Sequence, residues 1–231
     1  MIDLILSKYL YNLNCKKTNN YVKNKLGPVI TISRECGCNA SVIANKLSLE
    51  LSKQKKHVSN VEKWIWINKE ILSDSAKKLN VHPHKIEHIF KAEEKPFLED
   101  IVSSFFNSYI SESIIKKTIT DIIKLYAENG NVIIVGRAGS VITEYLPDSI
   151  HIKLIAPLTW RVDNFSKKNN LPAKEAKKII LNTDKNRENF IKFFTKNTDN
   201  ENYHAIFNCS KLSIDEIIKQ ILFLAKQKKL C

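Results

Sequence analysis

The stretch from Val29 to Leu47, VITISRECGCNASVIANKL, constrains the fold of this chain more than any other part of the sequence. Its first residues form a short β-branched run typical of a buried strand, and its last residues have the apolar spacing of a helix. A strand that passes through a tight turn into a helix is the layout of a phosphate-binding loop, because backbone N–H groups and the helix N-terminus then point at one oxyanion. The sequence therefore predicts a phosphate site built by the backbone at 37–41.

The loop departs from the strict pattern G-x-x-x-x-G-K-[ST] at three positions, where it has Arg34, Asn39 and Ala40. A backbone cradle needs small residues rather than a lysine. Gly37 adds no side chain, Cys38 and Ala40 are small, and asparagine tolerates left-handed backbone angles. The Ser41 hydroxyl could donate to phosphate or reach a magnesium ion. The alternative interpretation is an ordinary strand-to-helix turn in which Cys36 and Cys38 pack as small hydrophobic side chains.

Strands and helices alternate along the rest of the chain. Besides the run at Val29, four short, continuous apolar runs predict buried parallel strands, at 64–67, 132–135, 150–155 and 205–207. Helical patterns cover 40–54, 69–80, 97–128, 137–146, 158–169, 172–195 and 213–228. This order predicts an α/β fold, a parallel five-stranded sheet with helices on both faces and with ligands at the carboxyl ends of the strands.

The same patterns suggest how the chain is divided. Residues 1–28 are expected to form an N-terminal helical appendage, and 29–231 a single domain. The interval of about 69–130 is helical by pattern, which suggests a helical flap that binds substrate. A second helical segment, about 158–196, is rich in Lys, Arg and Asn, as a mobile lid would be.

Charge and cysteine content narrow the partners and the compartment. A formal net charge of +13 favours an anionic partner: a nucleotide, a polynucleotide or an acidic membrane. No apolar run reaches the roughly 18 to 20 residues needed to span a bilayer. The 5 cysteines are an odd number without a paired framework, so a cytoplasmic, reducing setting is expected.

Several separated blocks share a pattern with one known family. They lie at 33–47, 66–72, 133–139, 155–161, 183–195 and 203–208. In these blocks the chain resembles the bacterial cytidylate kinase-like family, whose loop also lacks the usual lysine. The resemblance implies a P-loop NTPase-type sheet with a helical acceptor flap and a helical lid. It also implies ATP-dependent phosphorylation of CMP, dCMP or a related nucleoside monophosphate, with ATP and Mg²⁺ bound.

The resemblance also implies roles for particular residues. Arg137 would hold the phosphate of the acceptor, and Arg161 and Arg187 would close over the transferring phosphoryl group from the lid. The resemblance further implies a donor site at Arg34, Gly37, Cys38, Asn39, Ala40 and Ser41, and acceptor contacts at Asn68, Lys69, Arg137, Asp184 and Lys185. Lys185 would be a further cation, with Asp184 as its orienting partner. Arg34 could instead form a structural ion pair with Glu35 or another acid.

Three departures from the family pattern keep other functions open. The chain has Cys38-Asn39-Ala40 where the family has Ser-Gly-Gly, Asn68 in place of an aspartate, and His204 in place of an acid. One alternative is therefore a protein of this fold that binds a nucleotide or another phospholigand without turnover. A lesser alternative, from the net charge, is nucleic-acid binding.

The segment 84–88 reads H-x-x-E-H, a spacing that zinc peptidases use on a helix. No downstream glutamate helix provides a third ligand. We therefore interpret 84–88 as part of a solvated flap helix.

Overall fold

The five β-branched runs form one parallel sheet in the order β2-β3-β1-β4-β5. The computed structural model describes residues 28–54, 63–68, 70–78, 111–196 and 200–230. The strands are β1 (Val29–Arg34), β2 (Ile65–Ile67), β3 (Val132–Val135), β4 (Ser149–Ile155) and β5 (Ala205–Asn208). All four pairings are parallel, so the carboxyl ends of the strands lie along one edge of the sheet. The predicted fold class is confirmed.

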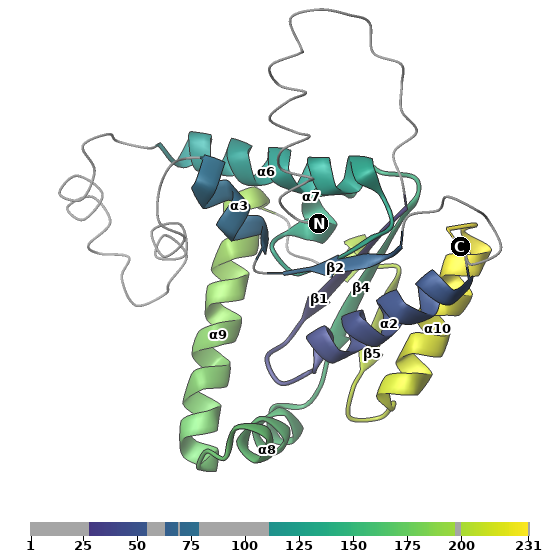
Figure 1. Cartoon of the computed structure of the whole chain (residues 1–231). Helices are drawn as coiled ribbons and strands as arrows, with labels where there is room; N and C mark the ends of the chain where they lie inside the picture. Colours follow the sequence, from purple (N-terminus) through teal and green to yellow (C-terminus); the bar gives the residue numbers. More distant parts are fainter. Residues whose placement is uncertain (1–27, 55–62, 69, 79–110, 197–199, 231) are drawn as a thin grey trace, which may run out of the picture.

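Helices connect the strands and cover the sheet (Figure 1). They are α2 (Ala40–Gln54), α3 (Glu70–Lys78), α6 (Glu112–Asn129), α7 (Gly139–Ile142), α8 (Leu158–Asn169), α9 (Ala173–Phe194), the 3-10 turn η2 (Asn200–Asn202) and α10 (Ile214–Gln227). The bounds of α2, α8, α9 and α10 agree with the predicted helical patterns within one residue at each end. None of the described helices has an apolar stretch long enough to cross a bilayer.

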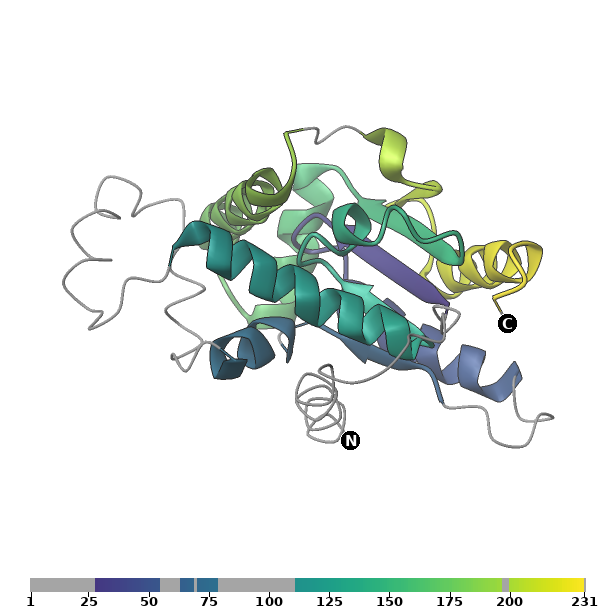
Figure 2. The same ribbon diagram turned by 90° about the horizontal axis from the view of Figure 1, so that it is seen from above.

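Alternate residues of each strand pack on opposite faces of the sheet, as the period of a β-strand requires. Ile30 and Ile32 of β1 belong to a core shared with α2 and α10. Val29, on the other face, belongs to a core shared with α6, α7 and Phe190 of α9. Figure 2 shows α6 and α10 on opposite sides of β1. Burial on both faces explains why the strand sequences are continuously apolar.

The helix predicted at 137–146 is wrong in its extent. Only Gly139–Ile142 is helical: the helix starts late because Arg137 and Ala138 have left-handed backbone angles, with φ of 56° and 54°, and it ends at Thr143, where φ and ψ are −106° and 11°. The left-handed angles interrupt a right-handed helix before it starts. The chain after β3 therefore turns sharply, and Arg137 stays beside the carboxyl end of the sheet.

His204 lies at the amino edge of the sheet, opposite the phosphate loop. Its Nδ1 accepts a hydrogen bond from the backbone N–H of His151 at 3.0 Å, and its Nε2 lies 2.8 Å from Nζ of Lys228. His204 therefore ties β4 to the end of α10. His204, one of the three departures named above, therefore lies away from the phosphate loop.

Parts of the predicted subdivisions fall outside the described residues. The N-terminal segment is described only at Pro28, and the flap of 69–130 is described at its two ends, α3 and α6. Tyr126 of α6 donates a hydrogen bond of 2.6 Å to the buried Asp74 carboxylate of α3. This bond fixes the two ends of the flap segment to each other. The H-x-x-E-H segment at 84–88 also lies outside the described residues.

Candidate phosphate-binding site

The loop between β1 and α2 has the geometry that the sequence predicts for a phosphate cradle. Gly37 and Asn39 both have positive φ, 96° and 50°, so glycine and asparagine occupy the two positions that need left-handed angles. A Cβ atom at Gly37 would lie 3.1 Å from both Cβ and the carbonyl oxygen of Arg161. Helix α2 begins at Ala40, and the first N–H groups of a helix have no partner inside the helix.

A cavity of about 240 Å³ opens in front of this helix terminus. Its walls come from the loop, from the end of β2 and from both lid helices. The lining residues are Arg34, Glu35, Cys36, Gly37, Cys38, Asn39, Ala40, Ser41, Val42, Asn68, Asn164, Phe165, Lys168, Asn169 and Arg187. All six residues of the predicted donor site therefore lie around one cavity.

Helix α8 lies directly on the loop. Arg161 Nη1 donates to the carbonyl oxygen of Cys36 at 3.3 Å, and Asn164 Nδ2 donates to that of Gly37 at 2.7 Å. Lys168 Nζ donates to the side-chain oxygen of Asn39 at 3.3 Å. The spacing of three and then four residues puts these side chains on one face of the helix. Asn164 and Lys168 escaped the sequence analysis, although this spacing was visible in the sequence.

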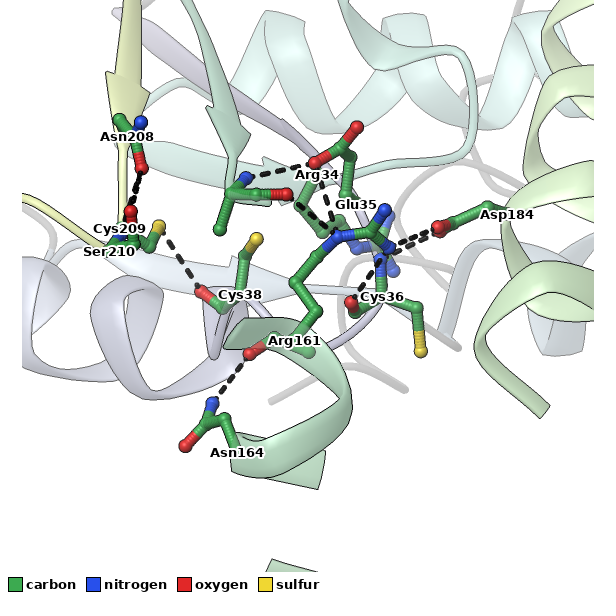
Figure 3. Close-up of polar contacts among 12 residues, drawn as sticks. Arg34, Glu35, Cys36, Cys38, Arg161, Asn164, Asp184, Asn208, Cys209 and Ser210 are labelled. Atoms are coloured by element: carbon green, nitrogen blue, oxygen red, sulfur yellow. Dashed lines mark hydrogen bonds and ion pairs between the residues drawn. The ribbon is translucent and has the colours of Figure 1, made fainter. Parts of the chain in front are cut away.

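Arg161 is a structural clamp (Figure 3). It is buried, its Nε donates to the carbonyl oxygen of Ala156 at 3.0 Å, and its Nη1 lies 2.6 Å from Oδ2 of Asp184. Glu35 adds a second carboxylate 3.4 Å from Nε and accepts a hydrogen bond from the Ala156 N–H. Arg161 is also absent from the lining of the cavity. The structure therefore places this arginine behind the loop, where it joins the loop to the lid.

Asp184 of α9 binds the loop itself. Its Oδ1 accepts a hydrogen bond of 2.7 Å from the backbone N–H of Cys36 and lies 3.4 Å from Nη1 of Arg187. The expected partner, Lys185, is exposed and lies near Glu188, whose pKa is lowered first by its hydrogen bond with Lys192 and less by the charge of Lys185. Asp184 thus orients two arginines and the loop, and the expected pairing of Asp184 with Lys185 is wrong.

Three arginines converge at the carboxyl ends of β1 and β3. Burial, followed by the charges of Arg187 and Arg137, lowers the pKa of Arg34 to about 9. The Arg34 guanidinium lies against Gly136, where an added Cβ atom would be 1.7 Å from Nη1. Arg187 donates to the carbonyl oxygen of Arg34 at 3.3 Å, and the Arg137 guanidinium lies 5.6 Å from the centre of the Phe190 ring. Crowded positive charges of this kind favour a bound anion.

Asn68, at the end of β2, reaches this arginine cluster. Its side-chain oxygen accepts a hydrogen bond of 3.4 Å from Nη2 of Arg34, and its backbone N–H donates to Glu70 at 2.7 Å. Arg34 thus contacts a neutral amide, while Glu35 bonds to Ala156 and Arg161, so the interpretation of an Arg34–Glu35 ion pair is wrong. Lys69 lies outside the described residues.

The loop cysteines are packing groups in this structure. Cys36 and Cys38 are both buried. Burial raises the pKa of Cys36, and a hydrogen bond with the Cys209 thiol, followed by burial, raises that of Cys38. Both therefore stay protonated thiols near neutral pH, unsuited to act as nucleophiles.

The donor set suits a phosphate-bound magnesium ion rather than a protein-only metal site. Among the described residues, no group of three or more His, Cys, Asp or Glu side chains could hold a metal. Mg²⁺ keeps several waters and is often bound through substrate phosphates with few protein ligands. The exposed Ser41, in the first turn of α2, is the residue of the cavity wall that fits this role.

Comparisons with known proteins agree with this architecture. The model of a family described as the cytidylate kinase-like family matches residues 29–211. No curated protein matches the chain significantly. An uncharacterized protein from Eubacterium ventriosum has a similar structure, with a TM-score of 0.62, 19% identity, and coverage of 87% of this chain and 98% of that one.

Two further solved structures are more distant. A shikimate kinase from Acinetobacter baumannii, in complex with shikimate, has a TM-score of 0.46 at 13% identity and covers 90% of this chain and 97% of its own. A gluconokinase from Sinorhizobium meliloti has a TM-score of 0.44 at 8% identity, with coverage of 89% and 94%.

Proposed function

The chain belongs to the cytidylate kinase-like family, and from this premise we propose that it transfers the terminal phosphoryl group of ATP to a nucleoside monophosphate. CMP or dCMP is the first candidate acceptor. The observation that carries the proposal is one cavity in which a backbone phosphate loop faces the guanidinium groups of Arg34 and Arg187. We further propose a cytoplasmic location, supported by the free thiols of Cys36, Cys38 and Cys209.

The donor side of the proposed site is the loop and the start of α2. The backbone at 37–41 would hold the β- and γ-phosphates of ATP, since helix N-termini and small-residue loops bind anions. Ser41 would hold a magnesium ion through its hydroxyl, and that ion would neutralise charge on the donor phosphates. Arg161 and Asn164 of α8 donate hydrogen bonds to the carbonyl oxygens of Cys36 and Gly37, so these oxygens would not oppose a bound anion as unpaired acceptors.

The acceptor side is the region where β1, β2 and β3 end; Arg34 and Asn68 there line the cavity, and Arg137 lies beside them without lining it. Arg137 would bind the phosphate of the monophosphate with its planar fork, and Asn68 would contact the acceptor beside it. Lys69 belongs to the same proposal by its place in the sequence. Arg34 lies between the loop and Asn68, so its charge would act on the phosphoryl group during transfer.

The proposed reaction needs positioning more than acid–base chemistry. An acceptor phosphate oxygen attacks the γ-phosphorus, the bond from that phosphorus to the bridging oxygen breaks, and ADP leaves with a nucleoside diphosphate as the second product. The attacking oxygen is already anionic, so no general base is required. Arg34, Arg137 and Arg187 would balance the charge that builds up, and Arg161, Asp184 and Lys185 would hold or supplement them from the lid.

A transfer assay tests the proposal directly. Full-length protein is incubated with ATP, Mg²⁺ and each of CMP, dCMP, UMP, AMP and GMP, and ADP formation is measured with and without the acceptor. We expect acceptor-dependent ADP formation, fastest with CMP or dCMP. Absence of transfer to every acceptor would contradict the assignment as a kinase.

The second candidate is a nucleotide-binding protein of the same fold without turnover. It is favoured by Arg161, a predicted catalytic residue that does not line the cavity and is bound behind the loop to the carbonyl oxygen of Cys36 and to Asp184. Calorimetric titration with ATP and Mg²⁺ distinguishes the two candidates. Binding of ATP without product for any acceptor would support the second candidate, whereas product formation would exclude it.

A further inference from the structure

We propose that Lys168 of the lid helix α8 supplies the positive charge that the phosphate loop lacks at Ala40, and that Asn39 positions it. This inference rests on the proposed function, because the anion it serves is a polyphosphate bound in the loop. Lys168 lines the cavity, and its ammonium group lies 3.3 Å from the side-chain oxygen of Asn39, the residue immediately before Ala40. The missing lysine of the loop is thus replaced from another part of the chain.

The position of Lys168 is fixed by the contacts that precede it on the same helix face. Arg161 and Asn164 bind the carbonyl oxygens of Cys36 and Gly37, and Lys168 then meets Asn39, so helix and loop run in matched order. Gly37 allows this approach, since a Cβ atom there would lie 3.1 Å from the backbone oxygen of Arg161. The contacts of Arg161 and Asn164 therefore fix the position of α8 along the loop, and this position puts Lys168 at the cavity.

The other cations of the site are engaged elsewhere or face another wall. Arg161 is buried against Asp184 and Glu35, and Arg187 shares the same Asp184 carboxylate. Arg34 bonds to Asn68 on the acceptor side. Within the described part of the chain, Lys168 contacts a neutral amide and no carboxylate, so its full charge is available to a ligand in the cavity.

Asn39 has a role beyond its backbone angle. Its φ of 50° is one that glycine, the family residue, adopts more readily. The asparagine side chain adds an oxygen that a glycine lacks, and that oxygen holds the ammonium group of Lys168. Asn39 is therefore a positioning residue, and its departure from the family pattern is explained by the lysine it holds.

The chemistry suits an ammonium group on a lid. Lysine is a compact charge on a flexible stem, so it can turn from Asn39 toward a phosphate oxygen without displacement of the helix. Lys168 is exposed, so it can exchange its amide partner for an anion. A charge carried by a lid reaches the phosphates only while the lid covers the loop.

Binding of inorganic pyrophosphate with Mg²⁺ tests the inference on the full chain, because pyrophosphate needs the loop but no base or sugar contacts. We compare wild type, Lys168→Met, and Lys167→Met as the matched control, an exposed lysine one residue away on the same helix. We expect Lys168→Met to weaken binding about ten-fold and Lys167→Met less than about two-fold. Equal affinities of the two variants, or a wild type that does not bind pyrophosphate, would overturn the proposal.

The positioning role of Asn39 is tested by a double-mutant cycle. Asn39→Gly is expected to weaken pyrophosphate binding in the wild-type background and to have little further effect in Lys168→Met, because both remove one interaction. Equal losses in both backgrounds, or tighter binding in Asn39→Gly, would contradict the role of Asn39. Unchanged unfolding midpoints would confirm that the loop stays folded.

The same variants separate this inference from the proposed kinase activity. If the protein transfers phosphate to CMP but Lys168→Met does not change the affinity for pyrophosphate, the kinase assignment stands and the proposed role of Lys168 is wrong. If pyrophosphate binding depends on Lys168 but no acceptor is phosphorylated, the proposed role of Lys168 is supported and the proposed kinase activity is contradicted.

Discussion

At the scale of single residues, the role of each charged side chain in this site depends on its contacts within the protein. The sequence predicts the same role for Arg161 and Arg187, as cations of the lid. In the structure Arg161 is buried against the loop, and of these two arginines Arg187 is the one that lines the cavity. Asp184 makes the difference, because one carboxylate joins the loop N–H of Cys36 to both arginines. A resemblance gives the residue types, and the hydrogen-bond partners decide the roles.

Substitution of Asp184 by asparagine is expected to destabilise the fold. The change keeps the shape but removes the charge that pairs with the buried Arg161 guanidinium 2.6 Å away. Glu35 retains a longer contact at 3.4 Å, so we expect a loss of about 2 kcal/mol in the free energy of unfolding. Urea unfolding measures this loss. Asp163→Asn, an exposed acid on α8, is the control and should change stability by less than about 0.5 kcal/mol. Equal losses of stability in Asp184→Asn and Asp163→Asn would contradict the role of Asp184 in holding Arg161.

Substitution of Gly136 by alanine is expected to lower phosphoryl transfer more than stability. The new Cβ atom would lie 1.7 Å from Nη1 of Arg34, so the guanidinium must leave its place beside Asn68. Positive φ at this glycine, 73°, adds about 1 kcal/mol of strain. Gly130→Ala also places an alanine at a positive φ, 69° at the end of α6, and serves as the control for backbone strain. We expect both variants to unfold at lower midpoints than the wild type, but at least about ten-fold slower transfer in Gly136→Ala only. A wild-type rate in that variant would show that Arg34 has no part in the reaction.

At the scale of elements, the sequence predicts what depends on local pattern. The strands are recovered because β-branched runs buried on both faces have a clear signature, as in β3 and β4. The helix at 137–146 is overpredicted because its composition permits a helix, whereas the left-handed angles at Arg137 and Ala138 depend on the turn after β3. The contact of α8 with the loop joins residues far apart in sequence, so the donors Asn164 and Lys168 could not be assigned from pattern alone.

The junction of β4, β5 and α10 predicts a pH dependence of stability. His151 is buried, its Nδ1 lies 2.8 Å from the Thr31 hydroxyl of β1, and its Nε2 lies 3.2 Å from that of Ser149. Burial, then the neighbouring His204 and Lys228, lowers the pKa of His151 to about 4. The unfolded chain takes up this proton near its usual pKa of about 6.5, so stability present above that pH is lost as the pH falls toward 4.

The expected loss from this group is roughly 2 kcal/mol between pH 7 and pH 5. Urea unfolding of wild type and His151→Gln at both pH values measures it, since the variant has no group that titrates at this position. The variant should be less stable at pH 7 but should lose less stability on acidification. Parallel losses in the two proteins would show that His151 does not contribute to the pH dependence.

At the scale of the whole molecule, whether the net charge of +13 indicates a polyanionic partner depends on where the positive charges are paired with acids. Lys46, Lys53 and Lys192 form ion pairs with Asp215, Glu50 and Glu188 on exposed helix surfaces. Interspersed charges of both signs oppose the continuous basic stripe that polynucleotide binding favours. Around the loop, by contrast, Arg34, Arg187 and Lys168 share one small cavity. We therefore expect a small polyphosphate to bind more tightly than a long polyanion.

Thermal unfolding tests this distinction on the intact chain. A ligand that binds only the folded state stabilises it by about 2.7 kcal/mol at 100 times its dissociation constant, which for a chain of this size raises Tm by about 5 to 10 °C. We expect such a shift with ATP and Mg²⁺ and a smaller one with an RNA oligonucleotide at equal phosphate concentration. Because counterion release makes polyanion binding weaken steeply with salt, the RNA shift should vanish between about 50 and 200 mM salt while the ATP shift persists. A larger RNA shift that survives at 200 mM, without an ATP shift, would contradict the nucleotide site and favour nucleic-acid binding.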